Sequence, residues 1–243
     1  MAIKLPTLKA DLPSNGFGYK EEDKILKSYT LNMMTLEDSK IMSSAGININ
    51  KMITEILDRC IKEDVDSSKL YSADRLYLFF MLRKLSFGEN YKLEYPCSNC
   101  AAKNTITMVI PEDFSVRLKE SDKFEDTVTL PLAKVKVSLR LLTGAQEDKL
   151  YKKSVQSRDD MVIDRIAAHT SLIVDGEEKH TSYPVIKRLI AQLPFRDVRV
   201  LEKSISELEF GLTTTIQASC ESCGSGEEVG VAIGHNFFRG DEG

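Results

Sequence analysis

The feature that most constrains the fold is a pair of C-x-x-C motifs that lie far apart in the chain. They are CSNC at residues 97–100 and CESC at residues 220–223. Four thiolates in two such pairs suit a tetrahedral zinc ion, because each motif presents two sulfur atoms to the same metal. The motifs therefore predict one structural zinc per chain, with Cys97, Cys100, Cys220 and Cys223 as its ligands.

The expected compartment favours a metal over disulfide bonds. The N-terminal sequence MAIKLPTLKADLPSNG contains no apolar run of signal-peptide length. We therefore expect a protein that stays in a reducing cytoplasm, where structural disulfides are disfavoured. A redox C-x-x-C site is a weaker alternative, because neither motif opens a helix after a strand, the arrangement that lowers the thiol pKa in thioredoxin-like sites. A metal with four sulfur ligands has no open position, so the site is expected to stabilise the fold rather than to catalyse.

The sequences that flank the two motifs are alike. LEYPCSNCAAKNTITMVIPEDF aligns with IQASCESCGSGEEVGVAIGHNF, and in both the apolar residues alternate with polar ones. The matched positions are Leu93 with Ile216, Ile106 with Val229, Met108 with Val231, Ile110 with Ile233, and Phe114 with Phe237. Alternation of this kind is typical of a strand. Each motif is therefore expected at the turn of a β-hairpin, and the two hairpins are expected to meet only in three dimensions.

The likeness extends upstream of the motifs. YTLNMMTLEDSKI resembles VSLRLLTGAQEDKL, and in both a strand pattern runs into a threonine, Thr35 or Thr143, that can cap the acidic start of a helix. Helical patterns follow over residues 49–61, 73–87, 161–174, 185–193 and 194–208. The predicted fold class is α+β, with an internally duplicated unit that consists of a strand, helices and a Cys hairpin. The first repeat spans residues 15–114, the second spans residues 122–237, and a zinc-ribbon-like site of four cysteines joins the two halves.

Two further features of the chain have structural interpretations. Cys60 lies on the apolar stripe of the helix predicted over residues 49–61, so we expect it in the core rather than at the metal. Residues 1–14 are predicted to form an extended N-terminal arm, because the segment is too broken by Pro6 and Pro13 for a helix and too apolar for a solvated tail. The arm either lies along a partner protein or packs on its own domain, and the sequence leaves both interpretations open.

Composition and charge narrow the functional class. The formal net charge is −4 and the isoelectric point about 5.6, which gives no electrostatic footprint for nucleic acid. No stretch approaches the roughly 18 apolar residues needed to cross a bilayer. None of the three histidines stands in a motif typical of a catalytic triad, so no enzyme is predicted. A zinc-ribbon protein that binds nucleic acid is the alternative function, although Lys103 is the one basic residue near either motif.

Four segments of the chain resemble a known family. They are LPSNG followed by Tyr19, LNMMTLED, SADRLYLFFMLRKLSFGENYKLEYPCSNC and VSLRLLTGAQEDKL. Together they resemble the baseplate hub assembly proteins of T4-type contractile-tailed phages. The resemblance covers nearly the whole chain and is most specific over residues 12–114. It implies a non-enzymatic viral protein that acts in hub assembly, as a chaperone-like assembly factor or as a hub subunit, through protein–protein surfaces.

The resemblance also implies partners and a location. The expected partners are other phage baseplate hub or tail proteins, without nucleic acid and without a membrane span. Whether the chain also forms a homo-oligomer stays open at this stage. The expected location is the host cytoplasm during assembly, with the tail baseplate of the virion as a second location.

Overall fold

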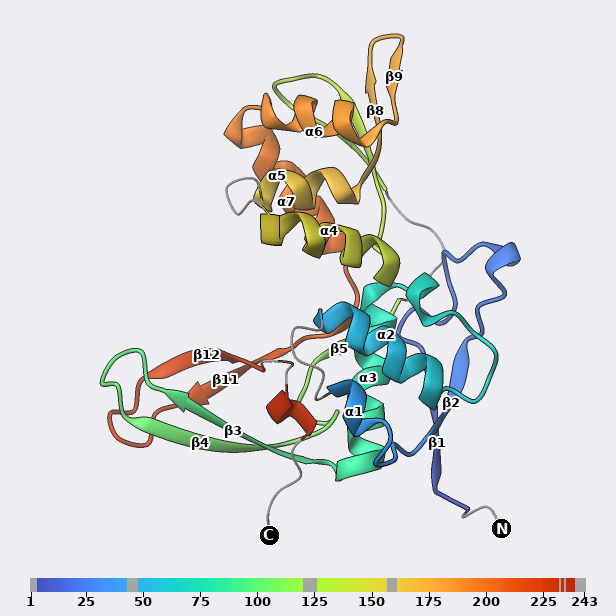
Figure 1. Ribbon diagram of the computed structural model, residues 1–243. Helices are drawn as coiled ribbons and strands as arrows, with labels where there is room; N and C mark the ends of the chain where they lie inside the picture. Colours follow the sequence, from blue (N-terminus) through green and yellow to red (C-terminus); the bar gives the residue numbers. More distant parts are fainter. Residues whose placement is uncertain are drawn as a thin grey trace. The chain divides into compact units, whose positions relative to one another are not determined.

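The computed structural model describes residues 4–42, 48–119, 126–156, 161–231, 233 and 235–238. Helices and strands are mixed along the chain, which confirms the predicted α+β class. The chain forms two compact units (Figure 1). Unit 1 comprises Met1–Ser67, Ala73–Glu120 and Gly211–Gly243, and unit 2 comprises Ser68–Ser72 and Ser121–Phe210. Unit 1 is therefore built from segments that are distant in the sequence.

The strands of unit 1 pair two by two in antiparallel ladders. The pairs are β1 (Thr7–Asp11) with β2 (Ser28–Asn32), β3 (Asn90–Pro96) with β4 (Lys103–Val109), β5 (Val116–Arg117) with β10 (Gly211–Leu212), and β11 (Thr215–Ser219) with β12 (Gly226–Gly230). The helices are α1 (Ser39–Met42), α2 (Ile49–Cys60), α3 (Ser72–Phe87, from its second residue on) and the short 3₁₀ helices η1 (Glu21–Asp23) and η3 (His235–Phe238). The 3₁₀ helix η2 (Ser67–Lys69) begins on the last residue of the first segment of unit 1 and continues into unit 2. The two Cys hairpins extend side by side from the helical part of this unit (Figure 1).

Helix α3 lies at the centre of the core of unit 1. Its side chains Phe79 and Phe80 are fully buried. The ring of Phe80 lies 5.3 Å from that of Phe114 and 4.7 Å from that of Phe237, measured between centroids. Sequence alignment places Phe114 and Phe237 at equivalent distances after the two C-x-x-C motifs. Both hairpins thus end on the same helix, and the segment that follows the second motif completes the core around the first.

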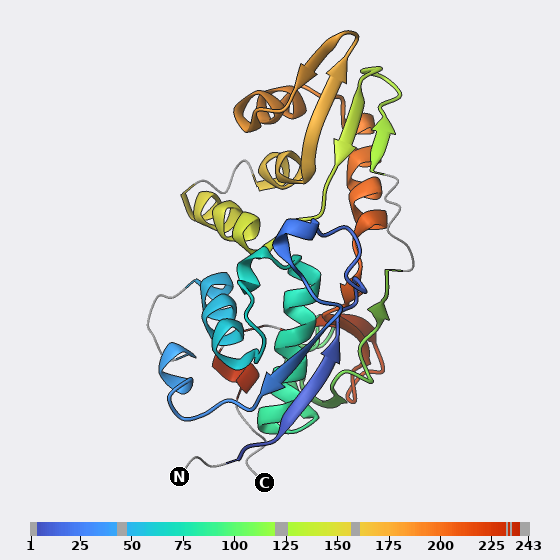
Figure 2. The same cartoon turned by 90° about the vertical axis from the view of Figure 1, so that its right-hand side faces the viewer.

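Unit 2 contains a four-stranded antiparallel sheet in the order β6-β7-β8-β9, packed with helices (Figure 2). Its elements are β6 (Thr127–Thr129), β7 (Lys136–Leu139), α4 (Gly144–Gln156), α5 (Met161–His169), β8 (Thr170–Asp175), β9 (Glu178–His180), α6 (Tyr183–Ala191) and α7 (Phe195–Leu208). Its core joins the sheet residues Val137 and Ile173 to Ile166, Ile190 and Leu201 of the helices. The apolar stripes of α5, α6 and α7 face this core, as their periodicity predicts.

Strand β1 lies inside the segment predicted as an N-terminal arm. Its five residues pair with β2 along their whole length, from Thr7 with Asn32 to Asp11 with Ser28. Ala10 is buried, and so is Leu12 directly after the strand. Residues 7–11 are thus extended and pair with a strand of their own unit, in line with the second of the two interpretations left open by the sequence.

Two predictions from local sequence patterns are wrong. The helix predicted over residues 161–174 ends at His169, and Thr170–Asp175 forms β8 instead. The segment TSLIVD is continuously apolar in its middle, and such a short run fits a buried strand as well as a helix. Thr35 does not precede a helix directly, because α1 begins only at Ser39. Thr143 does immediately precede α4, and its carbonyl oxygen accepts the N–H groups of the first turn.

The first turn of each unit is fixed in the same way, by a Leu-Pro dipeptide and a buried aspartate. A Leu-Pro dipeptide starts the turn after β1 and the turn after β6, and Leu12 and Leu130 are both buried. The fully buried carboxylate of Asp74, the third residue of α3, accepts the backbone N–H of Ser14 at 2.9 Å. The fully buried carboxylate of Asp197, the third residue of α7, accepts the N–H groups of Leu132 and Ala133 at 3.0 and 2.7 Å.

Candidate metal centre

The two C-x-x-C motifs adopt the same local backbone structure at the tips of their hairpins. The N–H of Cys97 donates to the carbonyl oxygen of Ala102, and the N–H of Ala101 donates back to that of Cys97, both at 2.9 Å. In the second motif Cys220 makes the equivalent pair of bonds with Ser225 and Gly224, again at 2.9 Å. Each loop is therefore closed by its own backbone hydrogen bonds, which need no metal.

A left-handed residue follows the second cysteine of each motif. Gly224 has φ of +71° and Ala101 has φ of +57°. Glycine adopts this conformation at little cost, whereas alanine is strained in it. The same left-handed conformation at Ala101 and Gly224 indicates that the backbone of this loop requires it.

The four paired cysteines come together as predicted. Their sulfur atoms all lie within 4.8 Å of one another. The Sγ atoms of Cys97 and Cys223 are 3.8 Å apart, and those of Cys100 and Cys220 are 3.7 Å apart. A tetrahedron with metal–sulfur bonds of about 2.3 Å has edges of about 3.8 Å. The sulfur positions and the all-thiol donor set therefore fit a tetrahedral zinc ion.

Donors around the sulfurs favour thiolates. The backbone N–H of Asn99 points at Cys97 Sγ at 3.4 Å, and the side-chain amide of Asn99 points at Cys223 Sγ at 3.6 Å. Cys97 and Cys220 are buried, while Cys100 and Cys223 are exposed. Each hairpin thus contributes one buried and one exposed sulfur to the cluster.

The thiols of the cluster differ in their pKa values. Backbone N–H groups, first that of Cys223, lower the pKa of Cys220 to about 6. At Cys100 the N–H of Ala102 acts in the same direction, but the neighbouring sulfur of Cys223 and loss of solvent raise the pKa to about 12. Four adjacent sulfurs repel one another when they all carry charge, and a divalent cation would remove that repulsion.

The hairpins also contact each other outside the cysteines. Tyr95, Ala218 and Val229 form a small buried cluster, against which Leu93, Ile106 and Ile216 pack. Ile106 pairs with Leu93 across the first hairpin and Val229 with Ile216 across the second, in the register that the aligned sequences predict. The alternating apolar residues thus form the contact between the two hairpins.

Two hydrogen bonds that the sequence does not predict also join the two hairpins. The buried side chain of Asn104 accepts the N–H of Glu221 at 3.1 Å, and a carboxylate oxygen of Glu227 accepts the N–H of Ser98 at 3.2 Å. Asparagine within a strand pattern is the one signal in the sequence, since this residue is depleted in strands unless it has a specific partner.

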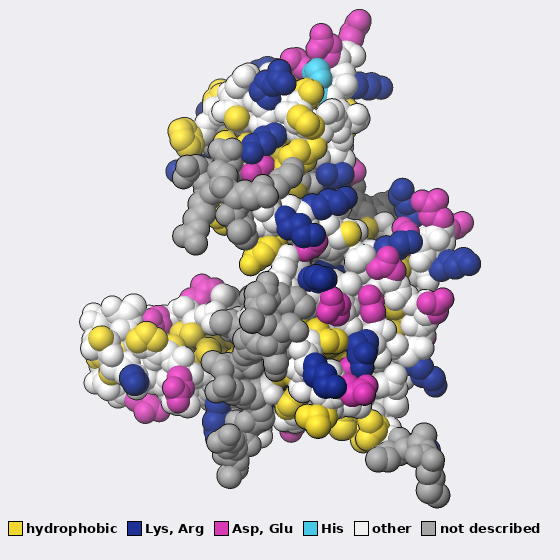
Figure 3. Space-filling view, viewed as in Figure 1, with side chains coloured by type: hydrophobic (Ala, Val, Ile, Leu, Met, Phe, Trp, Pro, Cys, Tyr) yellow, Lys and Arg dark blue, Asp and Glu magenta, His cyan; other side chains and the backbone are white. Residues whose placement is uncertain are grey.

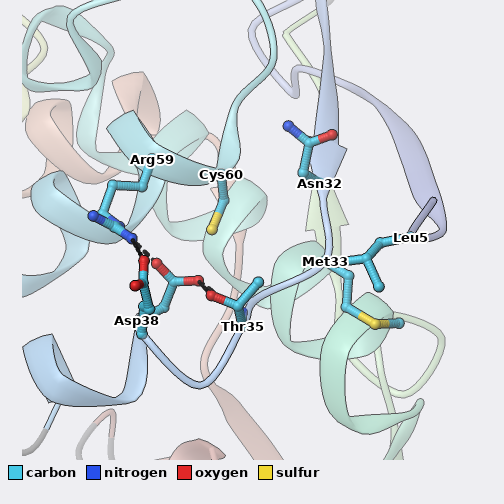
Figure 4. Close-up of a pocket in the computed structure, with 8 residues that line it drawn as sticks. Leu5, Asn32, Met33, Thr35, Asp38, Arg59 and Cys60 are labelled. Atoms are coloured by element: carbon cyan, nitrogen blue, oxygen red, sulfur yellow. Dashed lines mark hydrogen bonds and ion pairs between the residues drawn. The ribbon is translucent and has the colours of Figure 1, made fainter. Parts of the chain in front are cut away.

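Cys60 lies away from the cluster, in the core of unit 1, as predicted. It is the last residue of α2 and is 3% exposed. Burial raises the pKa of its thiol to about 12, so it stays protonated at neutral pH. Its sulfur lies beside an open pocket of about 560 Å³ next to β2 and α2 (Figure 4).

Three polar residues of this pocket, Thr35, Asp38 and Arg59, are linked by hydrogen bonds. Asp38 accepts hydrogen bonds from the N–H and hydroxyl of Thr35 and from Arg59 (Figure 4). Burial alone would raise the pKa of Asp38, but these hydrogen bonds and the charge of Arg59 outweigh it and lower the pKa. The ion pair therefore links the segment after β2 to the end of α2.

The surface charges are mixed. On the face shown in Figure 3, Lys and Arg side chains lie among Asp and Glu over both units. Within the part of the chain that the structure describes, no helix is both long and apolar enough to cross a membrane. The charge pattern on this face agrees with the acidic balance of the sequence and offers no continuous basic surface to a nucleic acid.

Comparison with known proteins identifies the family. Searches of curated proteins and of solved structures found no match. The sequence model of a family described as T4 bacteriophage base plate protein matches residues 5–239. Because this match covers nearly the whole chain, including both cysteine hairpins, the chain belongs to the T4 bacteriophage base plate protein family.

Proposed function

We propose that this baseplate protein is a non-enzymatic part of the tail baseplate hub, where it acts as an assembly factor or as a hub subunit. The family match over residues 5–239 carries the proposal, because it makes the chain a phage baseplate protein. The finer assignment to the hub rests on the resemblance of LPSNG, LNMMTLED and the α3 segment to hub assembly proteins. The partners in this proposal are other hub or tail proteins, met in the host cytoplasm during assembly.

The proposed cofactor is one structural zinc held by Cys97, Cys100, Cys220 and Cys223. Its support is the closeness of the four sulfurs, all within 4.8 Å. When bound, zinc would supply folding energy, because it joins two hairpins that are distant in the sequence. Four sulfur ligands leave no position for water or substrate, which supports a non-enzymatic role.

The proposed duplication of the fold has support beyond the sequence alignment. Leu31 of β2 bridges to Ile61 directly after α2, and the aligned Leu139 of β7 pairs with Thr170 directly after α5. The buried aspartates of α3 and α7 accept hydrogen bonds from equivalent Leu-Pro turns, the first of which lies directly before residue 15. We infer that residues 15–114 and 122–237 are repeats of one unit, and that the second repeat contributes its Cys hairpin to unit 1.

The hub assignment is tested by isolating a tagged copy of the chain from infected cells. Hub or tail proteins should co-purify with it, and should not co-purify with an unrelated tagged protein expressed to the same level. Mass spectrometry of mature particles then separates the two roles, since a hub subunit remains in the tail and an assembly factor does not. Co-purification of outer baseplate proteins without hub proteins would overturn the assignment to the hub.

A gel shift at low salt tests the alternative function. Phosphate contacts are strongest at low ionic strength, so a nucleic-acid-binding zinc ribbon would retard DNA or RNA there and release it as salt is added. We expect no retardation by the metal-loaded chain. Retardation that disappears with salt, together with failure to recover tail proteins, would favour the zinc-ribbon function.

A further inference from the structure

The sulfur contacts in the cluster link one hairpin to the other. Cys97 faces Cys223 at 3.8 Å, and Cys100 faces Cys220 at 3.7 Å. In each of these two pairs one cysteine is buried and the other is exposed. A disulfide has a sulfur–sulfur distance of about 2.0 Å, so each pair could close if its sulfurs approached by about 1.7 Å.

We propose that the cluster is an oxidation site in which a peroxide converts the four thiols into two disulfides between the hairpins, Cys97–Cys223 and Cys100–Cys220. The inference rests on the proposed metal site and adds a second chemical state to it. Zinc joins the hairpins in the reduced state, and two covalent bonds join them in the oxidised state. The contact between hairpins is then kept when the metal is lost.

The surroundings of the cluster favour disulfides between hairpins over disulfides within a motif. Each motif is closed by its own backbone hydrogen bonds, and the sulfur contacts at 3.8 and 3.7 Å each join a cysteine of one motif to a cysteine of the other. The hairpins are held in place by the apolar cluster around Tyr95 and by the bond from Glu221 to Asn104. Closing Cys97 on Cys100 would draw both sulfurs out of these contacts, whereas the cross pairs close along them.

Exposure gives the two members of each pair different roles. The exposed thiolate of Cys223 attacks one oxygen of hydrogen peroxide, the O–O bond breaks, hydroxide leaves, and a sulfenic acid forms on Cys223. The buried thiolate of Cys97 then attacks that sulfur, the S–S bond forms, and a second hydroxide leaves. The thiol of Cys100 gives up its proton to solvent, and Cys100 and Cys220 then react in the same way. Four thiolates thus give up four electrons to two peroxide molecules, which end as four hydroxide ions, and the metal loses its ligands.

The two states match two environments. A baseplate protein has a place in the tail of the virion. A particle is assembled in a cytoplasm, which is a reducing compartment. After release it is in oxidising surroundings that contain no glutathione or thioredoxin. Oxidation after release would make the joint between the hairpins independent of free zinc outside the cell.

The test oxidises the purified full chain with hydrogen peroxide and maps the disulfides after trypsin digestion. Cleavage after Lys92, Lys103 and Lys203 puts Cys97 and Cys100 in one peptide and Cys220 and Cys223 in another. We expect these two peptides to be linked by two disulfides, and the thermal transition to become insensitive to a chelator. Two unlinked peptides that each contain an internal disulfide, or sulfinic and sulfonic acids in place of disulfides, would overturn the proposal.

Matched double variants test the pairing itself. Cys97→Ser with Cys223→Ser keeps the facing pair Cys100 and Cys220, while Cys97→Ser with Cys220→Ser keeps Cys100 and Cys223. The first variant should form its disulfide at least about tenfold faster, because its sulfurs already face each other. Equal rates in two variants with the same circular dichroism spectrum would contradict the assigned pairs.

The same samples keep this inference separate from the metal proposal. Cys60 is an internal control, because its buried thiol, with a pKa of about 12, should stay reduced throughout. Metal content is measured before peroxide is added. Absence of metal at that point contradicts the structural zinc, whereas the disulfide map still decides the pairing.

Discussion

At the scale of single residues, buried polar groups set the positions of turns. Asp74 is fully buried and accepts hydrogen bonds from the N–H of Ser14 and from the hydroxyl of Tyr19. Burial raises the pKa of its carboxyl more than these two bonds lower it. A buried acceptor with fixed donors specifies one turn geometry, since an alternative turn would leave it unpaired. The Leu-Pro-Ser sequence of the family resemblance is the turn that Asp74 holds.

Cys60→Ser is predicted to lower stability without changing the metal content. A serine hydroxyl at this buried position needs a hydrogen-bond partner, and the expected cost is about 1–3 kcal/mol. Urea unfolding measures the cost, and elemental analysis measures zinc. Cys60→Ala is the matched control, because it removes the sulfur without adding a polar group. Loss of zinc in either variant would mean that the ligands have been assigned wrongly.

His169 is predicted to make unit 2 less stable in mild acid. Burial lowers the pKa of its imidazole below the ordinary 6.5, although its contact with the carbonyl oxygen of Arg140 opposes the shift. Below pH 6.5 the unfolded chain therefore binds a proton that the folded chain binds only at lower pH, so the free energy of unfolding falls as the pH drops from 6.5 toward the folded pKa. At higher pH both states are neutral and the residue contributes no pH dependence.

The measurement compares the wild type with His169→Asn. Asparagine can keep a donor near the carbonyl oxygen of Arg140 but does not titrate. Urea unfolding at about pH 7.5 and about pH 5.5 should give a larger loss for the wild type than for the variant. Other titrating groups are common to both proteins and cancel in the difference. Equal losses would show that His169 does not titrate differently in the two states.

At the scale of elements, the sequence predicts best where periodicity and chemistry agree. The helices α2, α3 and α7 and both Cys hairpins lie where apolar spacing and the C-x-x-C motifs place them. The prediction fails at β8, because residues 172–174 are all apolar and do not alternate with polar ones. This segment forms a strand by pairing with β7, which is distant in the sequence. The contacts of Asn104 and Glu227 depend on how the two hairpins meet, which no local pattern encodes.

Deleting residues 1–11 is predicted to destabilise unit 1. The deletion removes β1, so the ladder with β2 is lost and the buried Ala10 is removed. A partner-binding arm would leave the thermal transition almost unchanged, whereas loss of a paired strand should lower it by several degrees, since about 1 kcal/mol shifts the midpoint of a domain this size by about 2–4 °C. Deleting residues 1–4 is the control and should have little effect.

Gly211→Ala is predicted to destabilise unit 1 at the point where the chain re-enters it. Gly211 has φ of +96°, and an added Cβ would lie 2.8 Å from the Cβ of Ala73 on α3. Backbone strain costs about 1–3 kcal/mol, and the clash adds to it. Gly88→Ala is matched, since Gly88 has φ of +88° with nothing within 4 Å of the added atom. Equal losses in urea unfolding would show that the close contact with α3 contributes nothing.

At the scale of the whole molecule, the chain leaves unit 1, builds unit 2, and re-enters unit 1 at Gly211. The re-entering segment supplies β11, β12 and Phe237, and therefore half of the cysteine cluster and part of the aromatic core. Closing so long a loop costs entropy, and a bond between its ends recovers part of that cost. We propose that a metal ion held by the four cysteines provides this bond.

X-ray absorption at the zinc edge tests this proposal on the purified full chain, prepared without reductant or added metal. We expect about one zinc per chain, with a shell of four sulfur atoms at about 2.3 Å and no nitrogen or oxygen ligand. Cys60→Ala should give the same spectrum, and Cys223→Ser should lose the four-sulfur shell. A wild-type protein that folds without metal, or a zinc bound mainly by nitrogen and oxygen, would contradict the proposal that the four cysteines hold a structural zinc.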